Sequence, residues 1–224
     1  ILLQPDLGTV LVYIVVTAMM IMMSNISMRL ILLLVLAAIT AITMIFTSDV
    51  LEDYQKDRLT VFVLDDEAVA ELGADAVRIA YNAEQSQIAI GNGGLTGTGL
   101  FQGTQTSSNL VPEQQTDFIF SVAGEELGFR GASILLVLFA VVVVRIWRVA
   151  VRASDEFDRL MAVGVMSMFV FQVFQSAGMT MGMMPVTGIP MPFVSYGGSS
   201  MLTSMIAIGL ILGVSRRRFD YVRA

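Results

Sequence analysis

Long apolar stretches alternate with polar ones along this chain of 224 residues. Residues 7–28 and 30–48 contain no charged side chain, and residues 160–215 form a third uncharged run. A membrane-spanning helix needs about 20 predominantly apolar residues, and proline-rich backbone at 184–199 divides the third run in two. The pattern therefore predicts five membrane-spanning helices, at residues 7–27, 30–47, 131–147, 160–183 and 199–214.

The segment 48–130 has a different character, because it is polar and rich in acidic residues. Its first part predicts one or two short helices, the second of them lying on the membrane surface, and the glycine-rich stretch "GNGGLTGTGLFQG" follows at 91–103. We therefore expect an all-α integral membrane protein, a polytopic helix bundle with one large extracytoplasmic loop. Its parts are two membrane helices in 1–47, the loop in 48–130, and three membrane helices with a basic tail in 131–224.

Composition agrees with this class and also gives an orientation. The chain is 55% hydrophobic and only 14% charged, whereas soluble domains carry about 25% charged residues. Basic residues gather at Arg29, in the 145–159 stretch and in the 216–223 tail. The positive-inside rule places these three regions in the cytoplasm. The start of the chain, the 48–130 loop and the 184–199 stretch then lie outside the cytoplasmic membrane.

The chain has no cysteine and no histidine, which excludes thiolate metal sites and removes the commonest catalytic base. Proton transfer near neutral pH then falls mainly to carboxylates. Two of them, Glu113 and Asp117, lie in "VPEQQTDFIF" at 111–120, where a polar run turns apolar. Thr116 and Asp117 can also be interpreted as the cap and first-turn acid of a helix. Composition alone does not choose between the two acids or between these interpretations.

Three further stretches carry candidate chemistry beside a plainer interpretation. Asp6, in "QPDLGT", either acts at the outer surface or caps the first helix. The glycine-rich stretch lacks the Gly-Lys-Ser/Thr ending of a phosphate-binding loop, and we expect it to form turns. The stretch "VTGIPMPFVSYGGSS" at 186–200 either lines a cavity or forms a turn with a serine cap.

Four motifs together resemble one known family. "QPDLGT", "YNAEQSQIAIGNGGLTGTG", "VPEQQTDFIFSVAGEELG" and "PVTGIPMPFVSYGGSS" occur in the order typical of the SEDS family, the RodA and FtsW proteins of bacterial cell-wall synthesis. The forms "VPEQ" and "PFVSYGGSS" are more similar to RodA. The resemblance runs from about residue 4 to residue 218 and covers the C-terminal half of such proteins, so we expect this chain to be part of a longer protein.

The resemblance implies a peptidoglycan glycosyltransferase that polymerises lipid II into glycan strands during cell-wall elongation and shape maintenance. It also implies a class B penicillin-binding protein as partner, a transpeptidase, and no nucleic acid. The family's essential acidic residue falls on Asp117, which we expect to be the general base. Many relatives have histidine where this chain has Gln115. The residues that the motifs and their outer placement nominate for substrate binding are Asp6, Arg58, Glu113, Gln114, Gln115, Thr116, Ser195, Tyr196, Gly197, Gly198 and Ser199.

The pyrophosphate of such a substrate needs positive charge, and the outer segments offer few basic residues. This positive charge has three possible sources. It would come from Arg58 or Arg130 turning inward, from the remainder of a longer protein, or from a divalent cation such as Mg²⁺ or Mn²⁺. No cofactor is certain from the sequence. Two other functions stay open: a flippase for lipid-linked precursors, and a scaffold for a penicillin-binding protein.

Overall fold

A computed structural model describes residues 7–47, 58, 60–62, 69, 72–108 and 111–223, and these residues form helices and loops without a strand. Residues 58, 60–62, 69 and 72 are helical in addition to the helices of the list that follows. These helices are α1 (Leu7–Met23), α2 (Met28–Thr47), α5 (Ala74–Gly93), α6 (Thr104–Ser107), α7 (Ile119–Val151), α8 (Glu156–Thr180) and α9 (Gly198–Arg223).

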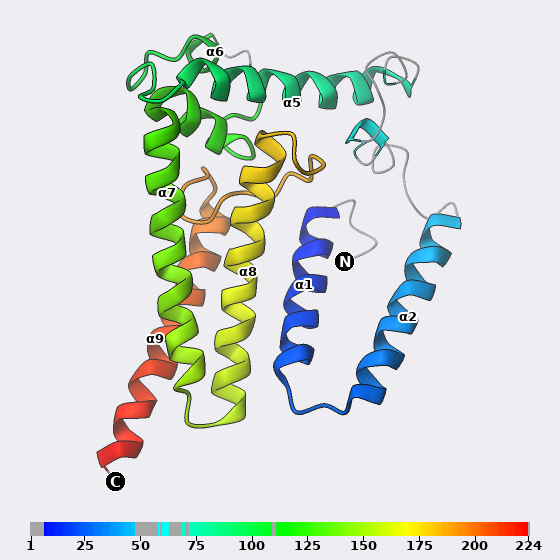
Figure 1. Cartoon of the computed structure of the whole chain (residues 1–224), viewed down its shortest axis with the longest axis vertical. Helices are drawn as coiled ribbons and strands as arrows, with labels where there is room; N and C mark the ends of the chain where they lie inside the picture. The colour runs from blue at the N-terminus through cyan, green and yellow to red at the C-terminus, as the bar shows by residue number, and fades with distance from the viewer. Residues whose placement is uncertain are drawn as a thin grey trace.

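Helices α7, α8 and α9 form a bundle against which α1 packs on the α8 side, while α2 stands apart (Figure 1). Small residues allow the close approach of α1 and α8, since a β-carbon on Gly164 would lie 3.1 Å from Met20 Sδ. A buried cluster that includes Phe169 and Ile146 joins α7, α8 and α9. The long hydrophobic runs of the sequence provide the apolar helix faces that pack in this bundle.

The outward faces of these helices are apolar as well, as expected for helices in lipid. Leu33 on α2 and Ile134 on α7 are each 61% exposed. Among the described residues, three helices are long and apolar enough to cross a membrane, namely α7, α8 and residues 198–217 of α9, and α1 and α2 hold shorter apolar stretches. The chain is therefore a multi-pass membrane protein built only from helices in its described residues, which confirms the predicted fold class.

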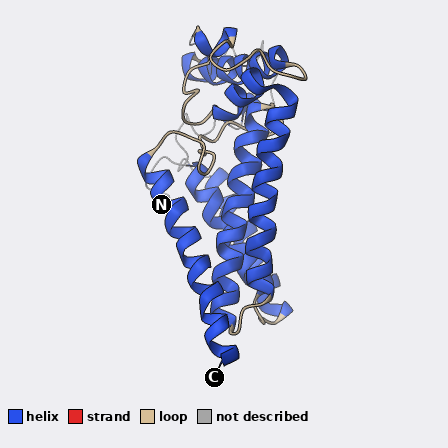
Figure 2. Cartoon of the chain, turned by 90° about the vertical axis from the view of Figure 1, so that its left-hand side faces the viewer, coloured by secondary structure: helices blue, strands red, loops and turns tan. Residues whose placement is uncertain are grey.

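One end of the bundle is covered by α5, which lies across it, with α6 and the connecting loops (Figures 1 and 2). The surface helix predicted in the 48–130 segment is thus a helix of 20 residues. It also includes Gly91–Gly93, which we expected to form turns, and the loop begins only at Gly94. This helix and the loops form a roof over the end of the bundle where the polar motifs gather.

Helix α7 is longer than the predicted span 131–147 and has a break. It begins at Ile119, and Gly128 interrupts it with φ 65° and ψ −171°. Backbone of the glycine-rich loop packs directly against this break, because Phe129 N donates to Gly94 O over 2.8 Å. The segment 119–127 therefore belongs to the roof, and the remainder of α7 belongs to the bundle.

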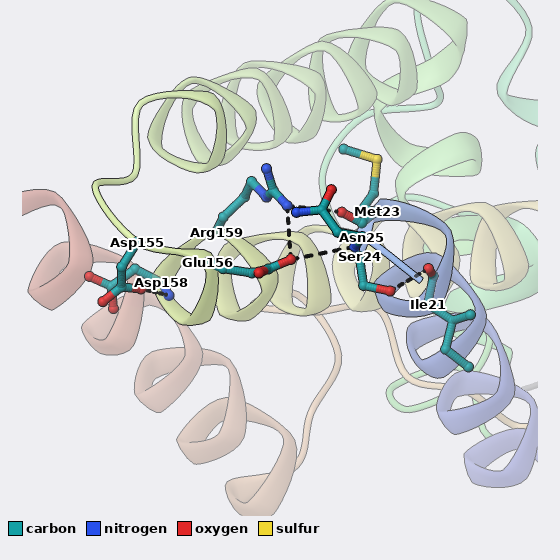
Figure 3. Close-up of polar contacts among 8 residues, drawn as sticks. All are labelled: Ile21, Met23, Ser24, Asn25, Asp155, Glu156, Asp158 and Arg159. Atoms are coloured by element: carbon teal, nitrogen blue, oxygen red, sulfur yellow. Dashed lines mark hydrogen bonds and ion pairs between the residues drawn. The ribbon is translucent and has the colours of Figure 1, made fainter. Parts of the chain in front are cut away.

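The opposite end of the bundle is tied together by polar contacts (Figure 3). Arg159 Nη2 donates to Met23 O over 3.3 Å and pairs with Glu156 Oε1 at 3.2 Å. Asn25 N donates to the same Glu156 oxygen over 3.4 Å. These contacts join the α1–α2 turn to the start of α8, so α1 is held against the bundle at both its apolar face and its end.

Candidate functional site

Two of the sequence motifs are joined by hydrogen bonds beneath the roof. Ser195 Oγ donates to Thr116 O over 2.6 Å and accepts a hydrogen bond from Met191 N over 2.7 Å. Tyr196 N donates to Gln115 O over 2.8 Å. The proline-rich stretch after α8 therefore holds the backbone immediately before Asp117, although about 80 residues separate the two motifs in sequence.

A cavity of about 460 Å³ opens beside this junction, and we call it the Asp117 cavity. Its walls come from α1, α8, α9 and the two joined loops. The lining residues are Thr9, Val12, Thr116, Asp117, Gln172, Gly188, Ile189, Pro190, Tyr196, Gly197, Gly198, Ser199, Ser200, Thr203 and Ser204. Hydroxyl groups, an amide and one carboxylate face a space large enough for part of a polar ligand.

The structure argues against a capping role for Asp117. The N-cap of α7 is Phe118, whose side chain makes no capping hydrogen bond, and the first turn of α7 contains no acidic residue. Phe118 is 2% exposed and fixes the chain in the core. The half-buried carboxylate of Asp117 instead lines the cavity that bears its name.

Arg58 lies next to Asp117 across Gly188. A β-carbon placed on Gly188 would lie 3.1 Å from Asp117 Oδ2 and 3.4 Å from Arg58 Nη1. Gly188 has φ 72°, a left-handed conformation that favours glycine. A cation and the candidate base thus share one narrow space.

The second acid of the motif points elsewhere. Glu113 O accepts hydrogen bonds from the backbone N–H groups of Thr116 and Asp117, each over 3.1 Å, so Glu113 shapes the turn. Its Oε2 accepts a hydrogen bond from Thr116 Oγ1 over 3.1 Å. Glu113 lines a separate hollow on the outer side of the loop, together with Gln114 and Gln115.

Gln115, the residue at the position where many relatives have histidine, does not line the Asp117 cavity. It lines the hollow beside Glu113 and another cavity of about 490 Å³ that also involves Tyr196 and Gly197. The side chain at position 115 therefore lies in the two neighbouring cavities and outside the Asp117 cavity.

The remaining predicted site residues divide between the cavity wall and its support. Tyr196, Gly197, Gly198, Ser199 and Thr116 line the Asp117 cavity. Ser195 does not, since its hydroxyl is buried between two protein partners. Asp6 lies outside the described residues. The substrate-binding role of these residues stays a prediction.

The sequence did not predict the part of the Asp117 cavity wall that comes from the membrane helices. The half-buried side chain of Gln172 on α8 lines the cavity with Thr9 of α1 and Thr203 of α9. Thr203 Oγ1 donates to Ser199 O over 2.8 Å, so its oxygen can still accept a hydrogen bond from a ligand. In a sequence, such a cavity-lining position on a helix can be recognised as an uncharged polar residue inside an apolar run.

Comparison with known proteins places the chain in a family. A family model for the FtsW, RodA and SpoVE proteins, described as "Cell cycle protein", matches residues 1–219. The chain belongs to this family, as the four motifs predicted, and is RodA-like within it.

Its relatives are longer proteins. The chain is 39% identical over 217 residues to peptidoglycan glycosyltransferase MrdB of Escherichia coli (strain K12), which covers 96% of this chain and 56% of that protein. It is 46% identical over 142 residues to stage V sporulation protein E of Bacillus subtilis (strain 168), covering 63% of this chain and 38% of that protein. The chain thus spans little more than half the length of the curated relatives it matches.

A solved structure has the same fold. A chain in "Structural coordination of polymerization and crosslinking by a peptidoglycan synthase complex" matches with a TM-score of 0.73 and 30% sequence identity. The match covers 97% of this chain and 58% of that chain. The arrangement of bundle and roof described above is therefore the one found in a solved relative.

Proposed function

We propose that the protein is a peptidoglycan glycosyltransferase, an inverting enzyme that polymerises lipid II with Asp117 as its general base. The observation that carries the proposal is the position of Asp117, the only carboxylate among the described residues that line the cavity beside the joined motifs. The relatives named peptidoglycan glycosyltransferase support the same activity. We place the reaction on the outer face of the bacterial cytoplasmic membrane, in cell-wall elongation and shape maintenance.

The chemistry that we propose needs one base and no strong acid. The 4-hydroxyl group of the acceptor sugar attacks the anomeric carbon of the donor, and its proton passes to Asp117. The bond from the anomeric carbon to the lipid-linked pyrophosphate breaks, and the pyrophosphate leaves as a stable anion. A single carboxylate suffices, because the sugar hydroxyl takes the place that water has in an inverting hydrolase.

Positive charge for the pyrophosphate comes from Arg58 and from beyond the described residues. Arg58 is adjacent to the Asp117 cavity at Gly188, whereas Arg130 is exposed beside the α7 break. Among the described residues, no three Asp or Glu side chains gather as metal ligands. A Mg²⁺ or Mn²⁺ ion at this site would be held mainly by the substrate phosphates, because the one carboxylate that lines the cavity among the described residues is the proposed base.

The test of the proposal is glycan synthesis from lipid II by the purified full-length protein in detergent. Asp117→Asn keeps the size of the side chain and removes the base, so we expect a loss of roughly 10²–10⁴-fold in rate. Glu113→Gln, the matched control on the same loop, should keep most of the activity. Wild-type rates in Asp117→Asn would exclude Asp117 as the base.

Two tests separate the alternative functions. Glycan synthesis in detergent is not expected of a flippase, because detergent provides no two membrane faces between which a lipid could be moved. A scaffold would still support cell growth after Asp117→Ala. Membrane transporters usually show ionisable residues near the bilayer midplane, whereas the polar residue of α8 that reaches the cavity is the amide Gln172. We also propose a class B penicillin-binding protein as partner, which the polymerization and crosslinking named for the solved relative support.

A further inference from the structure

Glu125 is a carboxylate with no exposed surface, and the proposed mechanism does not use it. It lies in the roof segment of α7, before the break at Gly128. Burying a carboxylate is costly unless hydrogen bonds compensate for the lost water. Its oxygens accept hydrogen bonds from Gln105 N over 2.8 Å, from Thr106 N over 2.9 Å and from Thr104 Oγ1 over 3.3 Å.

These donors belong to the short helix α6, whose own N-cap residue supplies no side-chain hydrogen bond. The N-cap residue is Gly103, where a β-carbon would lie 2.5 Å from Glu125 Oε2 and would displace the carboxylate. Backbone N–H groups at a helix start need acceptors, and Glu125 provides them from a different element. The carboxylate therefore fastens α6 to α7.

From α6 the connection continues to the loop that bears Asp117. Gln114 Nε2 donates to Thr106 O over 3.1 Å. Gln114 stands inside the tight turn in which Asp117 N donates to Glu113 O. A shift of α6 would thus move the turn that orients Asp117.

We propose that Glu125 is a positioning residue for Asp117 and that it acts through Thr106 and Gln114, a set that we call the Glu125 clamp. Ser195 and Tyr196 hold the Asp117 loop from the bundle side, and the clamp holds it from the roof side. Glu125 does not line the Asp117 cavity, so it acts on the base and not on the substrate. This inference rests on the proposed glycosyltransferase function.

A carboxylate is needed at this position because both of its oxygens face backbone N–H donors. Glutamine offers one oxygen and would direct its NH₂ group at the other donor. Glu125→Gln in the full-length protein should therefore loosen α6 and the 111–118 turn. Misplacement of a catalytic group by about 1 Å can cost roughly 10²-fold in rate, so we expect kcat to fall by about that factor, with the KM for lipid II within about twofold.

Two readouts test the clamp: hydrogen exchange, which is independent of the reaction, and the coupling of two substitutions in kcat. Hydrogen exchange of residues 104–118 should accelerate in Glu125→Gln, because local opening becomes easier, while exchange in the bundle part of α7 stays the same. Gln114→Ala cuts the second link of the clamp. Its effect on kcat should be non-additive with that of Glu125→Gln, as for residues acting in one network. Glu126→Gln, a half-buried neighbour on α7, is the matched control and should change neither readout.

Unchanged exchange in Glu125→Gln would overturn the clamp, and so would additive effects of the two substitutions on kcat. If Glu125→Gln does not fold, Gln114→Ala alone decides, because the clamp predicts a lower kcat at an unchanged KM. Failure of the glycosyltransferase proposal looks different: the wild-type protein then makes no glycan, while hydrogen exchange still reports whether Glu125 holds the 104–118 region.

Discussion

Glu113 and Asp117 stand four residues apart on one loop, yet they line different cavities. The backbone of Glu113, with φ 56°, closes a turn whose N–H donors include that of Asp117. The side chain of Glu113 bonds to Thr116 on the outer side. The turn therefore directs Asp117 into the cavity and keeps the other acid outside it, which is a physical reason for assigning the base to Asp117.

The narrow space at Gly188 gives the first prediction at the residue scale. Gly188→Ala adds a β-carbon against both Asp117 Oδ2 and Arg58, at a left-handed backbone angle. We expect kcat for glycan synthesis to fall roughly 10²-fold through displacement of the base, and the free energy of unfolding to fall by about 1–2 kcal/mol from the strained φ. Steady-state kinetics and thermal unfolding in detergent measure the two effects.

Gly91→Ala is the matched control for this substitution, because a β-carbon there would meet nothing within 4 Å. It replaces a helical glycine by a better helix former, and activity should stay at the wild-type level. Equal kinetics of Gly188→Ala and Gly91→Ala would show that the space between Asp117 and Arg58 tolerates a methyl group, contrary to the geometry described here.

Much of the cavity could be predicted at the level of motifs, but not its helical wall. The two loops that meet at Ser195 and Thr116 both stood out as polar, non-helical stretches beside apolar runs. The sequence did not predict that Gln172 and Thr203 line the cavity, because α8 and α9 are apolar around most of their circumference. Such a helix gives no amphipathic signal to show which side faces a cavity.

At the scale of the elements, the break in α7 separates a roof segment from a bundle segment. The backbone at Gly128 is left-handed, and a β-carbon there would collide with the backbone N of Gly97. Gly128→Ala should therefore lower the free energy of unfolding by more than the roughly 1–2 kcal/mol that the left-handed angle alone costs.

Thermal unfolding of the purified protein measures this effect, and Gly209→Ala in α9 is the control, since a β-carbon there meets nothing within 4 Å. We expect a lower unfolding temperature for Gly128→Ala and an unchanged or higher one for Gly209→Ala. The reverse order would mean that the glycine-rich loop can move away from α7 at little cost.

A buried acid near the start of α8 gives a second prediction at this scale. Asp158 is 4% exposed, and its Oδ1 lies 3.0 Å from Arg217 Nη2 of α9, whose side chain is half exposed. Arg217→Ala leaves the buried carboxylate without its partner, so we expect a loss of about 1–3 kcal/mol in the free energy of unfolding. Asp158→Asn added to Arg217→Ala should recover part of that loss.

A double-mutant cycle in a detergent unfolding assay measures this coupling. Arg216→Ala, the exposed neighbour, should cost less than 0.5 kcal/mol, roughly the limit for ordinary surface substitutions. A coupling near zero between Asp158 and Arg217 would mean that water already satisfies the carboxylate.

The helices themselves followed from the apolar runs, whereas their ends did not. Helix α7 begins at Ile119, twelve residues before the predicted span, because "GEELGFR" is polar enough to look like the end of a loop. Helix α9 continues to Arg223 through the basic tail, beyond the predicted end at 214. Hydropathy locates the part of a helix that lies in lipid, and a helix can continue past the membrane where water solvates its side chains.

At the scale of the whole molecule, the bundle has two chemically different ends. The roof end carries Asp117 and its cavity, and the other end carries the contacts of Arg159 with the α1–α2 turn. Basic residues of the turn between α7 and α8 and of the tail lie toward that second end. The positive-inside rule then predicts that the second end faces the cytoplasm and that the Asp117 cavity faces outside, as the proposed polymerisation of glycan strands requires.

This orientation can be tested because the chain has no cysteine of its own. Glu84→Cys places a thiol on an exposed position of α5 in the roof, and Arg152→Cys places one on the exposed turn after α7. A membrane-impermeant maleimide should label Glu84→Cys in intact spheroplasts, and Arg152→Cys only after permeabilisation. Leu138→Cys, exposed on α7 within the apolar run, is the control and should stay unlabelled, because a thiol in hydrocarbon does not form the reactive thiolate. The opposite pattern would place Asp117 in the cytoplasm and exclude an extracytoplasmic polymerase.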